Sequence, residues 1–140
     1  MNLRNKTNFI VIHCAATRPN MDIGVEEITR WHVDDNGWSD IGYHKVIRRN
    51  GVVEEGRNLK YMGAHAAGYN HKSLGVCMVG GMSDDLLAEN NFTDKQWTAL
   101  KDLMVQLQVD YPDTNIIGHN EISAKECPSF DVQQWKKDNM

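Results

Sequence analysis

A short run of apolar, mostly β-branched residues from Phe9 to His13 constrains the fold of this chain more than any other segment. An apolar run without polar alternation is typical of a strand that is buried on both faces of a sheet. A second run of this kind, from Leu74 to Val79, is followed by two glycines. Strands buried on both faces need helices on both sides. The sequence therefore predicts a central sheet with helices packed on it.

The segments between these runs predict helices and a hairpin. Apolar residues recur at helical spacing over residues 25–33 and 97–107, and Thr93 to Gln96 has the form of a capping box before the second helix. Asn50 and Gly51 separate two strand-like segments and favour a hairpin with a type I′ turn. A short strand over 115–118 and a last helix over 129–137 follow. This order predicts an α/β (α+β mixed) fold with a mixed central sheet, in one domain spanning residues 1–140.

Composition and charge exclude several classes of protein. Hydrophobic residues make up 41% and charged residues 24%, which excludes a disordered chain. The net charge of −4 gives no general attraction to nucleic acid, and no stretch is long enough for a membrane span. The three cysteines are widely spaced and odd in number, which fits a reducing compartment rather than a disulfide framework. Because the first residues contain no apolar run, we expect no secretory signal and a cytoplasmic location. We also expect a monomer.

Three side chains could together bind a metal ion. His13 and His119 each lie at the end of a predicted strand, and Cys127 follows His119 by a loop of eight residues. Two histidines and one cysteine leave a fourth position open, which is typical of a catalytic zinc site. The spacing alone is weak evidence and favours two ordinary histidines and a buried thiol, because the sequence contains no CxxC or HExxH pattern. We expect Cys14 and Cys77, inside apolar strands, to be small core residues.

Five motif-like segments follow one another along nearly the whole chain: residues 12–17, 37–44, 63–70, 73–77 and 118–131. In content and order they resemble the type-2 family of zinc-dependent N-acetylmuramoyl-L-alanine amidases. That family includes phage lysozymes and peptidoglycan recognition proteins. The resemblance implies one Zn²⁺ ion, with His13, His119 and Cys127 as its ligands.

The resemblance also implies roles for three further side chains. Tyr43 and Lys125 match the catalytic side chains of the family, and His65 matches a histidine beside the active-site cleft. The ammonium of Lys125 would stabilise the oxyanion formed when water attacks an amide. The phenol of Tyr43 would hold that water or move its proton. His65 would contact substrate or assist catalysis.

The function implied is that of a phage endolysin, which hydrolyses the amide between N-acetylmuramic acid and L-alanine in peptidoglycan. Such an enzyme, made in the cytoplasm of the infected host, would reach the wall only with help from another factor. The alternative is a non-catalytic peptidoglycan-binding module of the same fold. A further activity implied by the resemblance is inhibition of the phage RNA polymerase. A glycosidase is disfavoured, because the acidic residues near the motifs form no opposed pair: Glu121, Glu126 and Asp131.

For the remaining histidines and Trp38, the sequence predicts only where the side chains lie. We expect His32 and His71 at the surface, and His44 pointing away from Tyr43 on the pleat of a strand. Trp38 precedes that strand and either packs in the core or stacks on a sugar.

Overall fold

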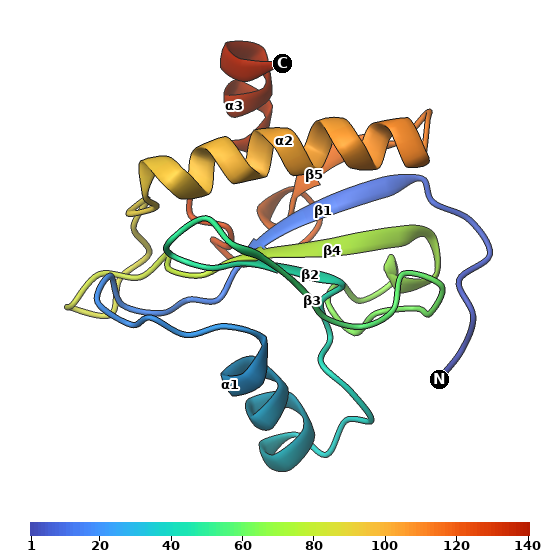
Figure 1. The fold of residues 1–140 in the computed structure, drawn as a ribbon, viewed down its shortest axis with the longest axis horizontal. Coiled ribbons are helices and arrows are strands. Elements are labelled where there is room, and N and C mark those ends of the chain that lie inside the picture. Colours follow the sequence, from blue (N-terminus) through green and yellow to red (C-terminus); the bar gives the residue numbers. More distant parts are fainter.

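A five-stranded mixed sheet forms the centre of the molecule in the computed structural model, which describes residues 1–140 (Figure 1). The strand order is β3-β2-β4-β1-β5. β1 pairs in parallel with β4 and β5, β2 pairs in parallel with β4, and β3 pairs antiparallel with β2. The strands are β1 (Phe9–Cys14), β2 (Lys45–Ile47), β3 (Val53–Glu55), β4 (Ser73–Met78) and β5 (Asn115–Gly118). The predicted mixed sheet is confirmed, and the two apolar runs are neighbouring strands within it.

Helices cover both faces of the sheet, as the buried strands require. α2 (Asp94–Asp110) and α3 (Val132–Asn139) lie on one side, and α1 (Val25–Arg30) lies on the other (Figure 1). α1 continues into a π-helical turn, Trp31–Asp35. The larger apolar cluster includes Leu100 and Met104 of α2, and the smaller one includes Ile28 of α1. No helix is both long and apolar enough to cross a bilayer.

The capping box predicted for α2 is present, and one of its members also fastens the helix to the sheet. Thr93 Oγ1 accepts the Gln96 N–H at 3.1 Å, and Gln96 Oε1 accepts the Thr93 N–H at 3.0 Å. The Gln96 side chain is fully buried, and its Nε2 donates to the carbonyls of Ile47 and Val79. Because these carbonyls belong to β2 and to the residue that directly follows β4, the cap fixes α2 on the sheet as well as starting it.

The hairpin at Asn50 and Gly51 is present, but the predicted type I′ turn is wrong. That turn needs positive φ at both residues, and only Gly51 has it, at +86°. Gly51 N–H donates to the Arg48 carbonyl and Arg48 N–H donates to the Val52 carbonyl, both at 2.9 Å, so the loop has three residues. Asn50 Oδ1 also accepts the Val52 N–H at 3.0 Å. This local bond stabilises a three-residue loop that ends in a left-handed glycine.

The parallel strands deliver their carboxyl ends to one edge of the sheet. β1, β4 and β5 are adjacent and parallel, so the residues at their ends converge there. In open sheets of this kind, ligands bind outside the carboxyl ends of the strands. His13 and His119 both lie at this edge.

Candidate active site

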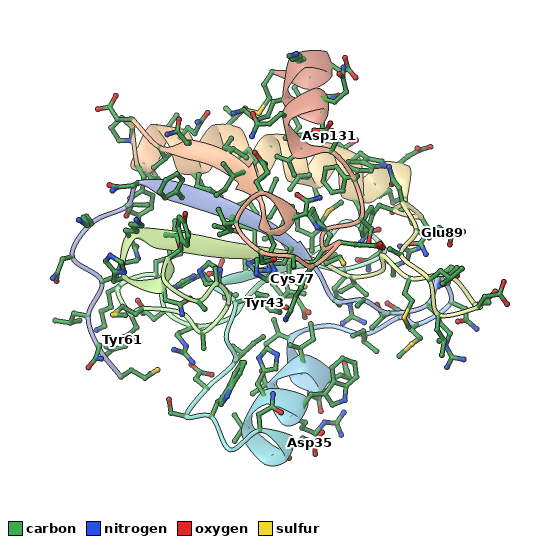
Figure 2. The ribbon with its side chains drawn as sticks, turned by 180° about the vertical axis from the view of Figure 1, so that it is seen from behind. Asp35, Tyr43, Tyr61, Cys77, Glu89 and Asp131 are labelled. Carbon is green, nitrogen blue, oxygen red and sulfur yellow. The ribbon has the colours of Figure 1, made fainter.

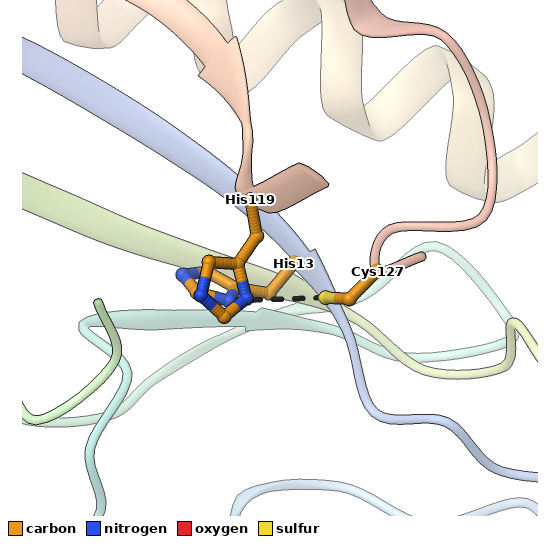
Figure 3. A group of neighbouring side chains, drawn as sticks. All are labelled: His13, His119 and Cys127. Atoms are coloured by element: carbon orange, nitrogen blue, oxygen red, sulfur yellow. Dashed lines mark hydrogen bonds between the residues drawn. The ribbon is translucent and has the colours of Figure 1, made fainter. Parts of the chain in front are cut away.

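The three proposed metal ligands come together at the carboxyl edge of the sheet (Figure 3). His13 is near the end of β1 and is 1% exposed, His119 follows β5 directly, and Cys127 lies in the loop before α3. Their ligand atoms all lie within 4.8 Å of one another. The clustering expected from the sequence is therefore present, although His13 is more than a hundred residues from the other two ligands.

The two ring nitrogens of His13 face different partners. Nδ1 lies 3.9 Å from Cys127 Sγ, and Nε2 lies 2.8 Å from His65 Nδ1. The backbone N–H of Cys14 donates to Cys127 Sγ at 3.1 Å, which fixes the sulfur beside the end of β1. Nδ1 is thus the His13 nitrogen that points into the ligand cluster.

The protonation of these groups suits a bound cation. Burial, together with His65, His119 and Lys125, lowers the pKa of His13 well below its usual value. Burial and Lys125 also lower the pKa of His119. Both imidazoles are therefore neutral near pH 7 and can offer lone pairs. The hydrogen bond with Cys14 and burial raise the pKa of the Cys127 thiol, so a cation that binds there must displace a proton. Two neutral imidazoles and one thiolate form a donor set that fits zinc.

Two adjoining cavities, of about 390 and 260 Å³, open beside the ligand cluster. The smaller one reaches all three ligand residues, and the larger one extends over the loop that carries His65 and Asn70. Five residues line both: Trp38, Ala64, His65, His119 and Lys125. Together the cavities form a groove that runs from the ligand cluster to the loop that carries His65 and Asn70.

Tyr43 and Lys125 both line the smaller cavity. Tyr43 precedes β2, and its ring centroid is 5.1 Å from that of His13. Figure 2 shows Tyr43 beside Cys77 in the middle of the molecule, between the sheet and α1. Burial and the neighbouring thiols raise the pKa of Tyr43 well above its usual value, so its phenol stays protonated. Lys125 lies two residues before Cys127, in the same loop.

His65 lies beside the groove, but both of its ring nitrogens face protein groups. It is 9% exposed, and Nδ1 meets His13 while Nε2 lies 3.2 Å from Ser73 Oγ. Its backbone N–H donates to Asn70 Oδ1 at 3.0 Å, which shapes the loop around it. His65 therefore lines both cavities while its two ring nitrogens are engaged by His13 and Ser73.

The prediction that His32 lies at the surface is wrong. His32 is half-buried, its Nδ1 accepts the Gly42 N–H at 2.9 Å, and its ring packs on those of Trp38 and Tyr43. The signal available in the sequence is its position four residues after the buried Ile28, on the same helical face. His71 is exposed as predicted, and Cys14 and Cys77 are buried as predicted.

Sequence reasoning also missed Ser73, which is fully buried and bonded to His65. A lone serine two residues before a glycine, in an otherwise apolar strand, was the only indication of it. His44 is buried as well, between the backbones of Gly75 and Tyr61.

Comparison with known proteins gives a consistent result. Residues 3–130 match the family model described as N-acetylmuramoyl-L-alanine amidase. The endolysin of Klebsiella phage KP32 is 46% identical and that of Escherichia phage T7 is 45% identical, each over 97% of this chain and 89% of the relative. Among solved structures, the endolysin N-acetylmuramoyl-L-alanine amidase LysCS from Clostridium intestinale superposes with a TM-score of 0.82. It is 29% identical, and the match covers 98% of this chain and 86% of that one.

Proposed function

The chain belongs to the N-acetylmuramoyl-L-alanine amidase family and is an endolysin amidase, and from this premise we propose that it works with one zinc ion held by His13, His119 and Cys127. The observation that carries the proposal is the convergence of these three ligand atoms within 4.8 Å on the floor of a groove. Three protein ligands with an open side are typical of catalytic rather than structural zinc.

Amide hydrolysis makes two demands, a polarised carbonyl and an activated water. Zinc supplies Lewis acidity for both when it is bound. The side chains of this protein supply the rest. We assign to the Lys125 ammonium the stabilisation of negative charge on the substrate carbonyl oxygen, because it lines the cavity that also reaches the ligands. We assign to the neutral Tyr43 phenol a hydrogen bond that orients the attacking water.

The substrate is peptidoglycan, and the groove has room for both sides of the scissile bond. The two cavities meet at Trp38, His65 and Lys125, so a sugar and a stem peptide can extend in different directions from the reacting amide. A non-catalytic binding module of the same fold would need the groove but not the ligands. The complete set of His13, His119 and Cys127 favours the enzyme.

The proposal is tested with Cys127→Ser. A neutral hydroxyl is a far weaker zinc ligand than a thiolate, so this variant should lose both zinc and lytic activity. Zinc is measured by elemental analysis, and the products by mass spectrometry, which should find stem peptides that begin with L-alanine. Thr98→Ala is the control, because Thr98 lies on the exposed face of α2 and lines neither cavity of the groove. Equal activity of parent and Cys127→Ser, without zinc in either, would overturn the proposal.

From the resemblance to phage lysozymes we also propose that a surface separate from the groove binds and inhibits a phage RNA polymerase. Support comes from similarity that extends over 97% of the chain and so includes surfaces far from the groove. If the two surfaces are separate, Cys127→Ser should still slow transcription by the cognate polymerase in vitro. No effect of the parent protein, even in large molar excess, would refute this activity.

A further inference from the structure

A chain of hydrogen bonds leads from the metal-ligand cluster into the core. It begins at His13 Nε2, which lies 2.8 Å from His65 Nδ1, and continues from His65 Nε2 to Ser73 Oγ at 3.2 Å. Ser73 Oγ then lies 2.7 Å from the carbonyl oxygen of Tyr69. His13, His65 and Ser73 are all at most 9% exposed, so water does not compete strongly for these bonds.

The hydrogen bond between Ser73 and Tyr69 determines which group donates in each of the other bonds of the series. A carbonyl can only accept, so the Ser73 hydroxyl donates its single proton to Tyr69 and must accept from His65 Nε2–H. A neutral imidazole carries one N–H, so His65 Nδ1 has no proton and accepts a hydrogen bond from His13 Nε2–H. His13 Nδ1 is then left with its lone pair. This is the nitrogen that faces Cys127 Sγ.

We propose that Ser73 and His65 are positioning residues, which set the tautomer of His13 so that Nδ1 is the metal-binding atom. The inference rests on the proposed zinc site but concerns only the protons of the polypeptide. It gives His65 a role other than contact with substrate, and it gives Ser73 a role that its sequence context did not indicate. Partners that orient a ligating histidine in this way are known to matter for metal affinity.

Gly75 provides a second observation that the site is built for this arrangement. A Cβ at Gly75 would lie 2.6 Å from His65 Cγ and 2.8 Å from His65 Nδ1. Since Ser73 and Gly75 point to the same face of β4, one residue bonds the far nitrogen of His65 and the other leaves space for its ring. Any side chain larger than hydrogen at Gly75 would push His65 out of line with His13.

The opposite arrangement is chemically complete and makes a different prediction. If Ser73 donated to His65 Nε2, then His65 Nδ1–H would donate to His13 Nε2, and His13 would carry its proton on Nδ1. That tautomer would have to be reversed before Nδ1 could bind a metal, and the Tyr69 carbonyl would lose the Ser73 bond. The 2.7 Å distance between Ser73 Oγ and the Tyr69 oxygen favours the first arrangement.

The tautomers can be read directly in the metal-free protein. Long-range ¹H–¹⁵N NMR spectra at pH 7 distinguish protonated from bare ring nitrogens, and we expect the Nε2–H form for both His13 and His65. The Nδ1–H form of His13 would overturn the proposal. Because this measurement uses neither zinc nor substrate, its failure is distinguishable from a failure of the proposed function.

Variants test the consequence for metal binding. Ser73→Ala removes the acceptor that orients His65, and we expect zinc affinity to fall about tenfold in competition with a chromophoric chelator. Ser73→Thr, which keeps the hydroxyl, should restore the parent affinity. Thr114→Val is the matched control: Thr114 is also buried and donates to a backbone carbonyl, that of Tyr111, but lies outside the chain of bonds. Parent-like zinc affinity in Ser73→Ala would overturn the proposal. If Ser73→Ala does not fold, the tautomers of the parent protein decide.

Discussion

Tyr43 and Lys125 line the same cavity as the three ligand residues, but neither belongs to the ligand cluster. We assign Tyr43 to the attacking water and Lys125 to the oxyanion, and neither to the metal. Tyr43→Phe and Lys125→Ala should therefore each lower turnover by about 10²-fold while zinc stays bound. Turnover is measured on purified peptidoglycan and zinc by elemental analysis. Lys137→Ala removes a similar charge from the exposed end of α3 and should change nothing. Parent turnover in either variant, or loss of its zinc, would contradict the assignment.

Trp38 is the second test at the scale of single residues. It is 37% exposed and lines both cavities, so its indole can pack against the sugar side of the substrate. An aromatic contact of this kind contributes about 1 kcal/mol, so Trp38→Ala should raise KM about fivefold with a smaller effect on kcat. Trp31→Ala is a close control, because Trp31 is equally exposed but lines neither cavity. Equal KM values for the two variants would show that Trp38 only packs.

At the scale of elements, His44 joins β4 to the loop around Tyr61. Its Nδ1 accepts the Gly75 N–H at 3.0 Å, and its Nε2 donates to the Tyr61 carbonyl at 2.8 Å. Burial lowers the pKa of His44 from 6.5 to about 4, against the opposing effect of the Tyr61 bond. Other charged or titratable groups facing it are Arg4, Arg57, Lys45 and His65. Protonation at Nδ1 would break the bond to β4.

The sign of the pH dependence follows from this lowered pKa. The unfolded chain binds the His44 proton near pH 6.5, but the folded protein does so only near pH 4. Stability from the neutral ring is therefore complete above pH 6.5 and is lost as pH falls toward 4, by up to about 3 kcal/mol. Urea unfolding of metal-free protein at several pH values measures this loss. His44→Gln should reduce the slope, whereas His71→Gln, at an exposed site, should leave it unchanged. Parallel curves for His44→Gln and parent would refute the explanation.

At the scale of the whole molecule, the sheet and its helices were predictable from the sequence. Segments that are buried in the core consist of runs of apolar residues, and these runs are visible in the sequence. The runs that became β1 and β4 are apolar except for His13 and Ser73, and Thr93 with Gln96 marks the start of α2. The turn type at Asn50 was not predictable from the dipeptide, because a side-chain bond to Val52 stabilises a longer loop. Local chemistry of that kind depends on how the flanking strands pair.

The site was predictable to a different extent. His13, His119 and Cys127 belong to segments whose order matches a family, so the resemblance alone groups them as one ligand set. His32 follows Ile28 at helical spacing, and that spacing was the only sequence signal for its burial. The bond between Ser73 and His65 depends on how a loop folds over the sheet, and it leaves no periodic pattern in the sequence. Residues that hold site residues in place without lining the groove, such as Ser73, are therefore the hardest to predict from the sequence.

A zinc titration of metal-free protein tests the central claim most directly. Protein stripped with a chelator is supplied with increasing zinc, and the release of stem peptides that begin with L-alanine is measured at each point. The proposed site predicts no release without zinc, a rise in proportion to added metal, and a plateau at one ion per chain. Full release of these peptides from the stripped protein would contradict the account.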